Sequence, residues 1–358
     1  MRRLLFLLLL SLPLVSQVKI LMPVVVKDAA GKPVTDLKIS DFQVSGPKDI
    51  RLSDMWLVPP QTPRDNGASP PVVVIYDAAN ILSNSFDLNV RDMRDFLHEV
   101  AQRRFAVTVL INTEAGLRLV YDSRTPPEIL LAALARTAQP KTMPSDIKAE
   151  TTDATAEEQA RNLTFLNTTG LVHRSRLNAG VDQMNSLLAF AHLAQRLPGR
   201  KALVWVATNP PVLDTRNPAY WNQTTTFVDK HLLPMYEATV EELNAARVSV
   251  YPLLFSRTNP IQFGNDWGSW MGLTQLAEST GGLASRLGDQ GSLLAAVHAA
   301  LADLGPYYML AVEVPIPKEL DWIGVKIKAT RPGVTVRAAS GFLSLKPVKA
   351  ANAQAAQH

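Results

Sequence analysis

The sequence predicts an α/β fold in which a doubly wound, mainly parallel sheet is inserted into a small β-domain formed by the N- and C-terminal segments. Two observations predict it. Short apolar runs rich in β-branched residues alternate with amphipathic helical segments through the middle of the chain, which is the pattern of repeated βαβ units. At both ends strands follow one another with no helix between them. Because a lone N-terminal hairpin is marginal in water, we expect the two ends to pair.

The order of these segments also divides the chain. We expect a signal peptide at 1–16, an N-terminal β segment at 17–60, a linker at 61–71, an α/β domain at 72–304, a C-terminal β segment at 305–346 and a disordered tail at 347–358. The tail is rich in alanine and glutamine and lies at a chain end, where order is least expected.

The composition excludes several classes of protein. With 47% hydrophobic and 19% charged residues, the chain is not disordered as a whole. The net charge of +4 comes with no clustered basic stripe, so we expect no nucleic-acid partner. Because the sequence has no cysteine, a disulfide framework and a thiolate zinc site are both excluded.

The segment 1–16 has the form of a secretory signal. Arg2 and Arg3 precede the leucine-rich run Leu4–Leu10, and the small residue Ser16 follows. We expect cleavage near Ser16. Retention as an uncleaved anchor is the alternative, and either outcome exports the chain, to the periplasm or as a secreted protein. No later apolar run reaches the length of about 18 residues that a membrane span needs, so we expect no transmembrane span in the mature chain.

The N-terminal β segment begins with a predicted strand over Val18–Val26. A turn signal follows at Lys27–Val34, and apolar residues over Leu37–Val44 complete a predicted hairpin unit with a short helical or irregular turn at 40–42. The proline-rich stretch Ser53–Pro71 is interpreted as the linker into the α/β domain.

The predicted central strand of the α/β domain is Val72–Tyr76. Its five apolar, mostly β-branched residues run without a polar break, as in a strand buried on both faces. The other predicted strands are Phe105–Asn112, Leu117–Tyr121, Ala202–Ala207, Val248–Phe255 and Leu283–Arg286. The predicted helices are Asp87–Arg104, Pro126–Ala138, Leu177–Leu197, Phe227–Arg247, Met271–Thr280 and Ser292–Leu304. Between them lies a long polar excursion, Gln139–Arg176.

The pattern changes past Gly305, where helices no longer separate the strands. Three strands with alternating apolar residues are predicted at Tyr307–Val314, Trp322–Thr330 and Val334–Leu345. A turn signal, Arg331-Pro332-Gly333, separates the last two.

Asp77 directly follows the central strand and is the first candidate site residue. In an open α/β sheet, ligands bind in the crevice outside the carboxyl ends of the strands, where the strand order reverses. Two roles for Asp77 stay open at this point. It contacts a ligand at that crevice, or it is structural, capping the next helix or accepting hydrogen bonds from loop amides.

Five strings in this order resemble the bacterial von Willebrand factor A-related family best known from acidobacterial genomes. They are GKPVTDLKISDFQV (Gly31–Val44), VIYDAAN (Val74–Asn80), LPGRKALVWV (Leu197–Val206), LAESTGG (Leu276–Gly282) and the final strands from YYMLAVEV (Tyr307–Val314) to GFL (Gly341–Leu343). The resemblance covers nearly the whole mature chain. It implies a von Willebrand A-type α/β domain with flanking β segments in an exported protein.

The resemblance also implies a metal-ion-dependent adhesion site, which this sequence carries only in degenerate form. The family uses an acid and two hydroxyls in DxSxS, a threonine from a second loop and an acid from the loop after the fourth strand. Asp77 matches the first acid, but Ala79 and Ile81 replace the hydroxyls. The remaining oxygen donors would be Asn80, Thr208 and Asn209, with Asn178 where the threonine is expected. One carboxylate predicts at most weak binding of Mg²⁺ or Mn²⁺ at Asp77, and we expect no resident cofactor.

A second group of candidate contact residues is the tryptophan pair Trp267 and Trp270. They lie in the glycine-rich stretch Gly264–Gly272, interpreted as a loop before a helix. Tryptophan is enriched at interface hot spots, so the pair are candidate anchors for a partner. The alternative is that both pack under the loop as a satellite core.

Taken together, these features predict an exported, non-enzymatic protein-binding module that uses the loops at the carboxyl edge of its sheet. The sequence contains no HExxH, GxSxG or GxxxxGK[ST] motif. Two other functions stay open. One is a hydrolase whose site lies in the excursion 139–176, with the acids and bases Asp153, Glu157, Glu158 and His173. The other is a structural protein in which the β segments mediate assembly and the α/β domain is a spacer.

Overall fold

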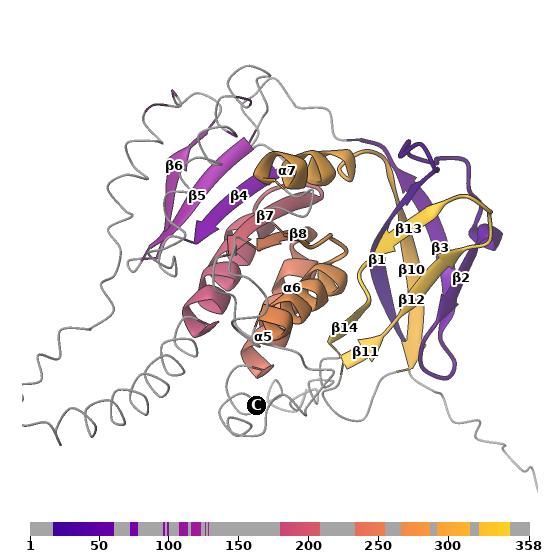
Figure 1. Cartoon of the computed structure of the whole chain (residues 1–358). Helices are drawn as coiled ribbons and strands as arrows, with labels where there is room; N and C mark the ends of the chain where they lie inside the picture. The colour runs from indigo at the N-terminus through magenta and orange to yellow at the C-terminus, as the bar shows by residue number, and fades with distance from the viewer. Residues whose placement is uncertain are drawn as a thin grey trace, which may run out of the picture.

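The structure of the protein is a computed structural model, which describes residues 17–60, 72–77, 96, 99, 107–113, 116–122, 126, 128, 180–207, 233–254, 266–286, 292–315 and 322–343. The described elements form two neighbouring units (Figure 1). The α/β unit contains a six-stranded sheet with helices on its faces, and the β unit contains strands from both ends of the chain. No helix in these ranges is long and apolar enough to cross a bilayer.

The sheet of the α/β unit is mainly parallel. Its strands are β4 (Val72–Asp77), β5 (Val107–Thr113), β6 (Gly116–Tyr121), β7 (Lys201–Ala207), β8 (Val248–Leu254) and β9 (Ser285–Arg286). Their order is β6-β5-β4-β7-β8-β9, and only β6 runs antiparallel to its neighbour. The predicted mainly parallel α/β sheet is therefore confirmed, and the predicted central strand lies in its interior. The strand order reverses at β4, which has β5 on one side and β7 on the other.

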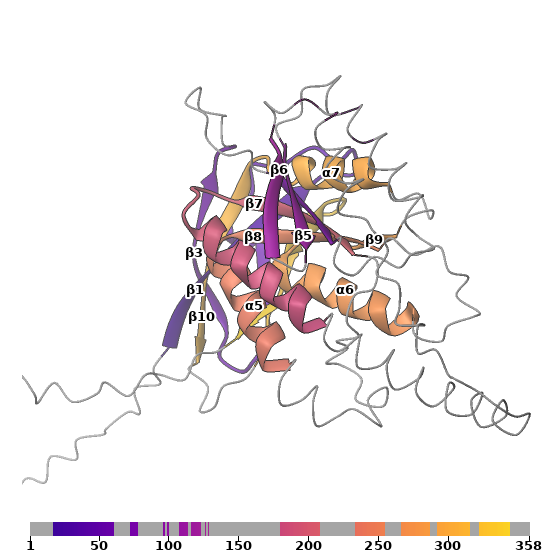
Figure 2. The same cartoon turned by 90° about the vertical axis from the view of Figure 1, so that its left-hand side faces the viewer.

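Both faces of the central strands are buried, which explains their continuous apolar runs. Alternate residues of β4 enter two different cores. Val72, Val74 and Tyr76 pack on the side of helix α7 (Leu293–Ala302), whereas Val73 and Ile75 face the opposite side. The opposite side is covered by a helix at 180–195 and by α5 (Leu233–Ala245) and α6 (Asp266–Thr280) (Figure 2).

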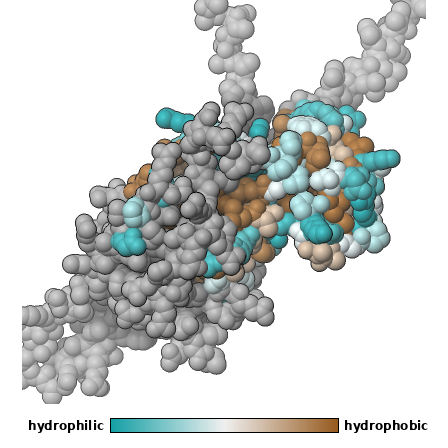
Figure 3. Space-filling view, turned by 90° about the horizontal axis from the view of Figure 1, so that it is seen from above, coloured by the Kyte–Doolittle hydropathy of each residue, from teal (hydrophilic) through white to brown (hydrophobic). Residues whose placement is uncertain are grey.

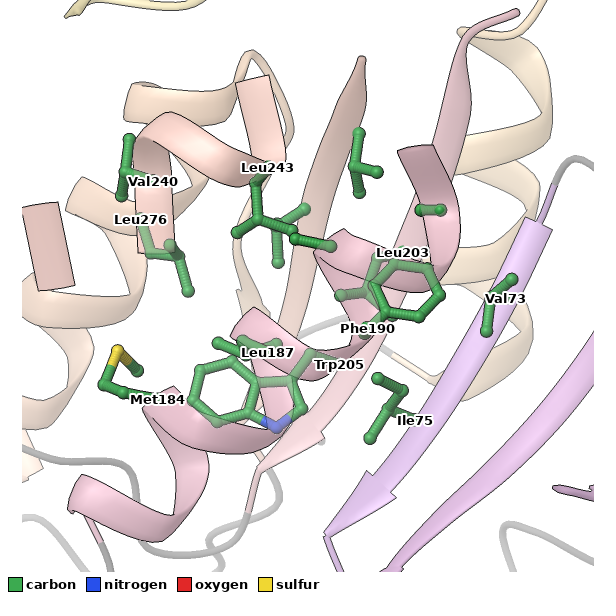
Figure 4. Packing of buried hydrophobic residues seen from close by; sticks show 14 of the residues in the cluster. Val73, Ile75, Met184, Leu187, Phe190, Leu203, Trp205, Val240, Leu243 and Leu276 are labelled. Atoms are coloured by element: carbon green, nitrogen blue, oxygen red, sulfur yellow. The ribbon is translucent and has the colours of Figure 1, made fainter. Parts of the chain in front are cut away.

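The larger of these two cores is centred on aromatic and branched side chains. Figure 4 shows Trp205 of β7 between Leu187 of the helix at 180–195 and Ile75 of β4, with Phe190 beside Leu203. Complete burial of such side chains stabilises a fold by about 1.5–3 kcal/mol each. This core fixes the rotation of the helix at 180–195, and thereby decides which of its polar residues point at the sheet.

The predicted start of α6 is wrong. The helix begins at Asp266 rather than Met271, so Trp267 and Trp270 lie within the helix and not in a loop before it. Glycines lower intrinsic helix propensity, which is why the stretch reads as a loop. Trp270 packs against the core of the sheet, and this tertiary contact outweighs the propensity.

The β unit contains strands from both ends of the chain. They are β1 (Gln17–Lys27), β2 (Phe42–Ser45), β3 (Arg51–Val58), β10 (Tyr307–Pro315), β11 (Trp322–Gly324), β12 (Lys326–Ala329), β13 (Thr335–Ala338) and β14 (Gly341–Leu343). One antiparallel sheet has the order β13-β1-β10-β3, and two further pairs are β2 with β12 and β11 with β14. Side chains from the sheet and from β2 and β12 share one apolar core, which includes Tyr308 and Phe42 in edge-to-face contact. A short 3₁₀ turn, η1 (Ile39–Asp41), precedes β2, where the sequence predicts a helical or irregular turn at 40–42.

Three details of the β unit differ from the sequence-based expectations. First, β1 and β2 do not form a hairpin, because β1 pairs with β10 and β13 while β2 pairs with β12. Second, β3 occupies part of the stretch Ser53–Pro71 that was interpreted as linker. Third, each of the last two predicted strands is divided into two strands with different partners. β11 pairs with β14 and β12 with β2, while β13 pairs with β1 and β14 with β11.

The two units meet at a group of polar and charged side chains around the buried Asp303. This group, the Asp303 cluster, consists of Lys27, Arg200, Tyr251, Asp303 and Arg337. Asp303 ends α7 and is 1% exposed. Its carboxylate pairs with Lys27 of β1 and Arg337 of β13 and accepts a hydrogen bond of 2.6 Å from the Tyr251 hydroxyl. Arg200 donates to the Asp303 backbone carbonyl at 2.6 Å, and its guanidinium lies 5.7 Å from the centre of the Tyr307 ring. The cluster thus joins strands of one unit to a helix of the other.

Candidate functional site

The candidate site lies at the carboxyl edge of the sheet, at the point where the strand order reverses. β4 ends at Asp77, and in the parallel register Asp77 lies beside Asn112 of β5. β4 is the strand at which the order of the sheet reverses, with β5 on one side and β7 on the other. This is the position at which open α/β sheets bind ligands.

Asp77 is buried, with an exposed fraction of 1%, and both of its carboxylate oxygens accept hydrogen bonds. Asn112 donates from Nδ2 to Oδ1 at 2.9 Å, and Gln183 donates from Nε2 to Oδ2 at 2.5 Å. A buried carboxylate is costly unless such donors satisfy it. The two amides therefore make the buried position of Asp77 tenable.

A serine extends these contacts into a network. Ser186 donates from Oγ to the Asn112 Oδ1 at 2.8 Å, and it lies three residues after Gln183 on the helix at 180–195. Residues three apart share a helix face, so both side chains reach the sheet edge together. We call Asp77, Asn112, Gln183 and Ser186 the Asp77 network. It ties the ends of β4 and β5 to the helix that packs beside them.

The Asp77 network does not fit a divalent metal in this conformation. Mg²⁺ needs free oxygen lone pairs in a roughly octahedral arrangement. The oxygens of Asp77 instead face amide N–H donors, and the Asn112 oxygen accepts from Ser186. Among the described residues, no three histidine, aspartate or glutamate side chains gather as a metal-ligating group. These contacts agree with the structural role of Asp77 rather than with metal ligation.

Trp270 and Arg286 form a second feature of the same edge. The parallel register places Arg286 of β9 beside Leu254, the last residue of β8, and therefore at the carboxyl end of that strand. The Arg286 guanidinium lies 4.4 Å from the centre of the Trp270 ring, which is partly buried against the core. Trp270 thus packs against the core of the sheet from within α6, and not under a loop. The Trp267 side chain lies outside the part of the chain that the structure describes.

The remaining predicted contact residues fall outside the described ranges. They are Asn80, Asn178, Thr208 and Asn209, together with the hydrolase candidates Asp153, Glu157, Glu158 and His173. Conversely, sequence reasoning missed Asn112, Gln183, Ser186 and Arg286. The available signals were weak: Asn112 ends an apolar strand, and Gln183 stands between the apolar positions of its helix.

The opposite, amino edge of the sheet holds a perturbed lysine. Lys201 begins β7, is 4% exposed and donates from Nζ to the Leu197 carbonyl at 2.9 Å. Burial, assisted by the positive charge of Arg247, lowers the pKa of Lys201 to about 8. Because it lies at the other end of its strand, it does not belong to the candidate site.

Comparisons with known proteins identify no family. No family model matches the chain, and no curated protein matches it. Among solved structures, the crystal structure of the TFIIH p34 N-terminal domain is similar, with 13% sequence identity and a TM-score of 0.27. That match covers 63% of this chain and 94% of the other. At this TM-score the similarity supports no argument about fold or function.

Proposed function

We propose that this chain is an exported, non-enzymatic protein-binding module of von Willebrand A type, which presents the loops at the carboxyl edge of its sheet to a protein partner. The observation that carries the proposal is the Asp77 network. It anchors the ends of β4 and β5 and the helix at 180–195 by hydrogen bonds of 2.5–2.9 Å. Loops that leave such an anchored frame are held at fixed starting points, which reduces the entropy lost when they bind.

The chemistry of the network favours binding over catalysis. General acid–base catalysis needs a titratable group within reach of a substrate proton. Asp77 is the single ionisable side chain of the network, and amides already occupy both of its oxygens. It therefore acts as a structural anchor in this proposal, and the partner contacts the loops around it.

The finer features of the proposal rest on separate observations. The five sequence strings support the von Willebrand A type, and the segment 1–16 supports export to the periplasm or beyond. The antiparallel pairing of β1 and β3 with β10 supports a small β-domain that is formed by the N- and C-terminal segments and into which the α/β unit is inserted.

The test is quantitative affinity capture with residues 17–358 from the cell envelope of the source organism. One variant replaces Thr208 and Asn209 by alanine, and a matched control replaces Arg196 and Lys328, which are exposed and far from the carboxyl edge. We expect a protein that the wild type and the control retain and the loop variant loses. Equal capture by all three, or none, would overturn the proposal.

Assembly through the β unit is the second candidate function. Trp56 of β3 lies opposite Met309 of β10, Leu21 of β1 lies opposite Ala311, and these side chains share one sheet face. Trp56 and Leu21 remain 41% and 48% exposed. Figure 3 shows hydrophobic and hydrophilic residues mixed over the surface of the β unit. Light scattering decides: an oligomer that Leu21→Ser dissociates would favour assembly, and a monomer would exclude it.

A further inference from the structure

Arg286 lies at a position where the described part of the chain offers its positive charge no ionic partner. Among the described residues, its guanidinium makes no hydrogen bond and no ion pair, and its one specific contact is the Trp270 ring. Nε is buried without a hydrogen-bond acceptor, while the residue as a whole keeps part of its surface exposed. Arginine carries five N–H donors and stays charged at every physiological pH. Leaving the buried Nε–H without an acceptor costs stability, and no hydrogen bond or ion pair within the described residues offsets that cost.

The neighbouring tryptophan orients this cation. A guanidinium stacked on an indole ring keeps its hydrogen-bonding edge free and is held in one plane. Trp270 is itself fixed, because it packs on the core of the sheet from within α6. The pair therefore presents a preorganised, planar set of donors at the carboxyl edge.

The ligand that matches a planar pair of donors is a carboxylate. Arginine and carboxylate form two parallel N–H···O bonds, and these are among the strongest polar contacts in proteins. Partial burial increases their strength because it excludes competing water. Trp and Arg are also the residue types most enriched where protein interfaces gain their affinity.

We propose that Arg286, stacked on Trp270, is the anchor for an acidic side chain of the protein partner. This inference rests on the proposed function and specifies the chemistry of the partner. The anchor lies on the same edge as the Asp77 network but three strands away, because β7 and β8 separate β4 from β9. The partner is thus expected to span from the switch point to the edge of the sheet.

The test measures binding of a fluorescein-labelled oligoglutamate peptide to residues 17–358 by fluorescence anisotropy, with oligoglutamine as the neutral control. We expect saturable binding by the wild type that becomes about tenfold weaker or worse in Arg286→Gln. Arg286→Lys keeps the charge but not the bidentate geometry, so we expect it to bind more weakly than the wild type. Arg196→Gln removes the same charge at the opposite edge of the sheet and is expected to bind as the wild type does.

Several outcomes would overturn the anchor. The first is no saturable binding of the peptide by the wild type. The second is an equal loss of binding in Arg196→Gln and Arg286→Gln. The third is that inorganic phosphate displaces the peptide completely while acetate, added at the same concentration, leaves it bound. Circular dichroism and melting of each variant separate loss of the site from loss of the fold. If Arg286→Gln still captures the envelope protein that the loop variant loses, the anchor fails while the proposed function stands. If neither the wild type nor any variant captures an envelope protein, the proposed function is itself overturned, and the anchor with it.

Discussion

The Nζ of Lys27 lies 2.5 Å from Oδ1 of Asp303, and this ion pair joins the first strand of the β unit to the end of α7 in the α/β unit. The Lys27 side chain is 16% exposed and that of Asp303 is 1% exposed, so water screens the pair only weakly. Arg337 and the Tyr251 hydroxyl contact the same carboxylate. The buried Asp303 therefore pairs with Lys27, a residue more than 270 positions away in the sequence.

Asp303→Asn is expected to destabilise the protein by about 3 kcal/mol, because removing one member of a buried ionic group leaves the others uncompensated. Urea denaturation followed by tryptophan fluorescence measures this loss. Asp36→Asn is the matched control, since Asp36 pairs with Arg331 on the exposed surface and should contribute little. Equal losses of unfolding free energy in the two variants would show that the Asp303 cluster contributes no more to stability than an exposed ion pair does.

The parallel sheet was largely predictable from the sequence, and the reason is physical. β4, β7 and β8 are buried on both faces, so each reads as a mainly apolar run with few polar residues, which is unlike a surface segment. β3 was missed because it is an edge strand with mostly exposed side chains and carries little apolar signal. Which strands pair in the β unit depends on residues at opposite ends of the chain, and no local pattern encodes that choice.

Gly282→Ala is expected to destabilise the fold by about 2 kcal/mol or more, because the chain at the end of α6 approaches β8 too closely for any side chain. A Cβ at this position would lie 1.8 Å from the Val250 carbonyl oxygen. Gly305→Ala is the control, since its Cβ would meet the Pro33 side chain at 3.5 Å and the Ala302 carbonyl oxygen at 3.9 Å, both ordinary van der Waals contacts. Thermal unfolding of both variants tests the prediction, and a Gly282→Ala protein as stable as Gly305→Ala would contradict it.

Asp77→Ala is expected to lower the melting temperature, because it removes the acceptor of both the Asn112 and the Gln183 amides. Hydrogen bonds to charged groups contribute about 1.5–3 kcal/mol each. An ion that binds only the folded state must raise the melting temperature. Because amide donors already occupy both Asp77 oxygens, we expect millimolar Mg²⁺ or Mn²⁺ to raise the melting temperature of neither protein. Melts with ion and with chelator measure this, and an ion-dependent rise in the wild type that Asp77→Ala abolishes would restore a metal site.

The candidate site was only partly predictable. Asp77 follows an obvious central strand, so the switch-point rule identifies it from sequence. Its partners Gln183 and Ser186 depend on how the helix at 180–195 is rotated, and that rotation is decided by side chains such as Trp205 on a distant strand. The strand that ends at Arg286 was predicted, but the contact of Arg286 with Trp270 depends on how α6 packs on the sheet, which no local pattern encodes.

Lys201→Met is expected to remove a pH dependence of stability above neutrality. Burial lowers the pKa of Lys201 to about 8, whereas an unfolded lysine titrates near about 10.4. Between these values the unfolded chain binds the proton and the folded chain does not, so the wild type gains stability as the pH rises through this window. Burial raises the pKa of Tyr251, so above about pH 10 its ionisation in the unfolded state opposes the gain. Urea unfolding at about pH 7.5 and about pH 9.5 therefore isolates the lysine. Lys328→Met, at an exposed position of β12, should keep the wild-type slope, and a slope that survives in Lys201→Met would assign it to another group.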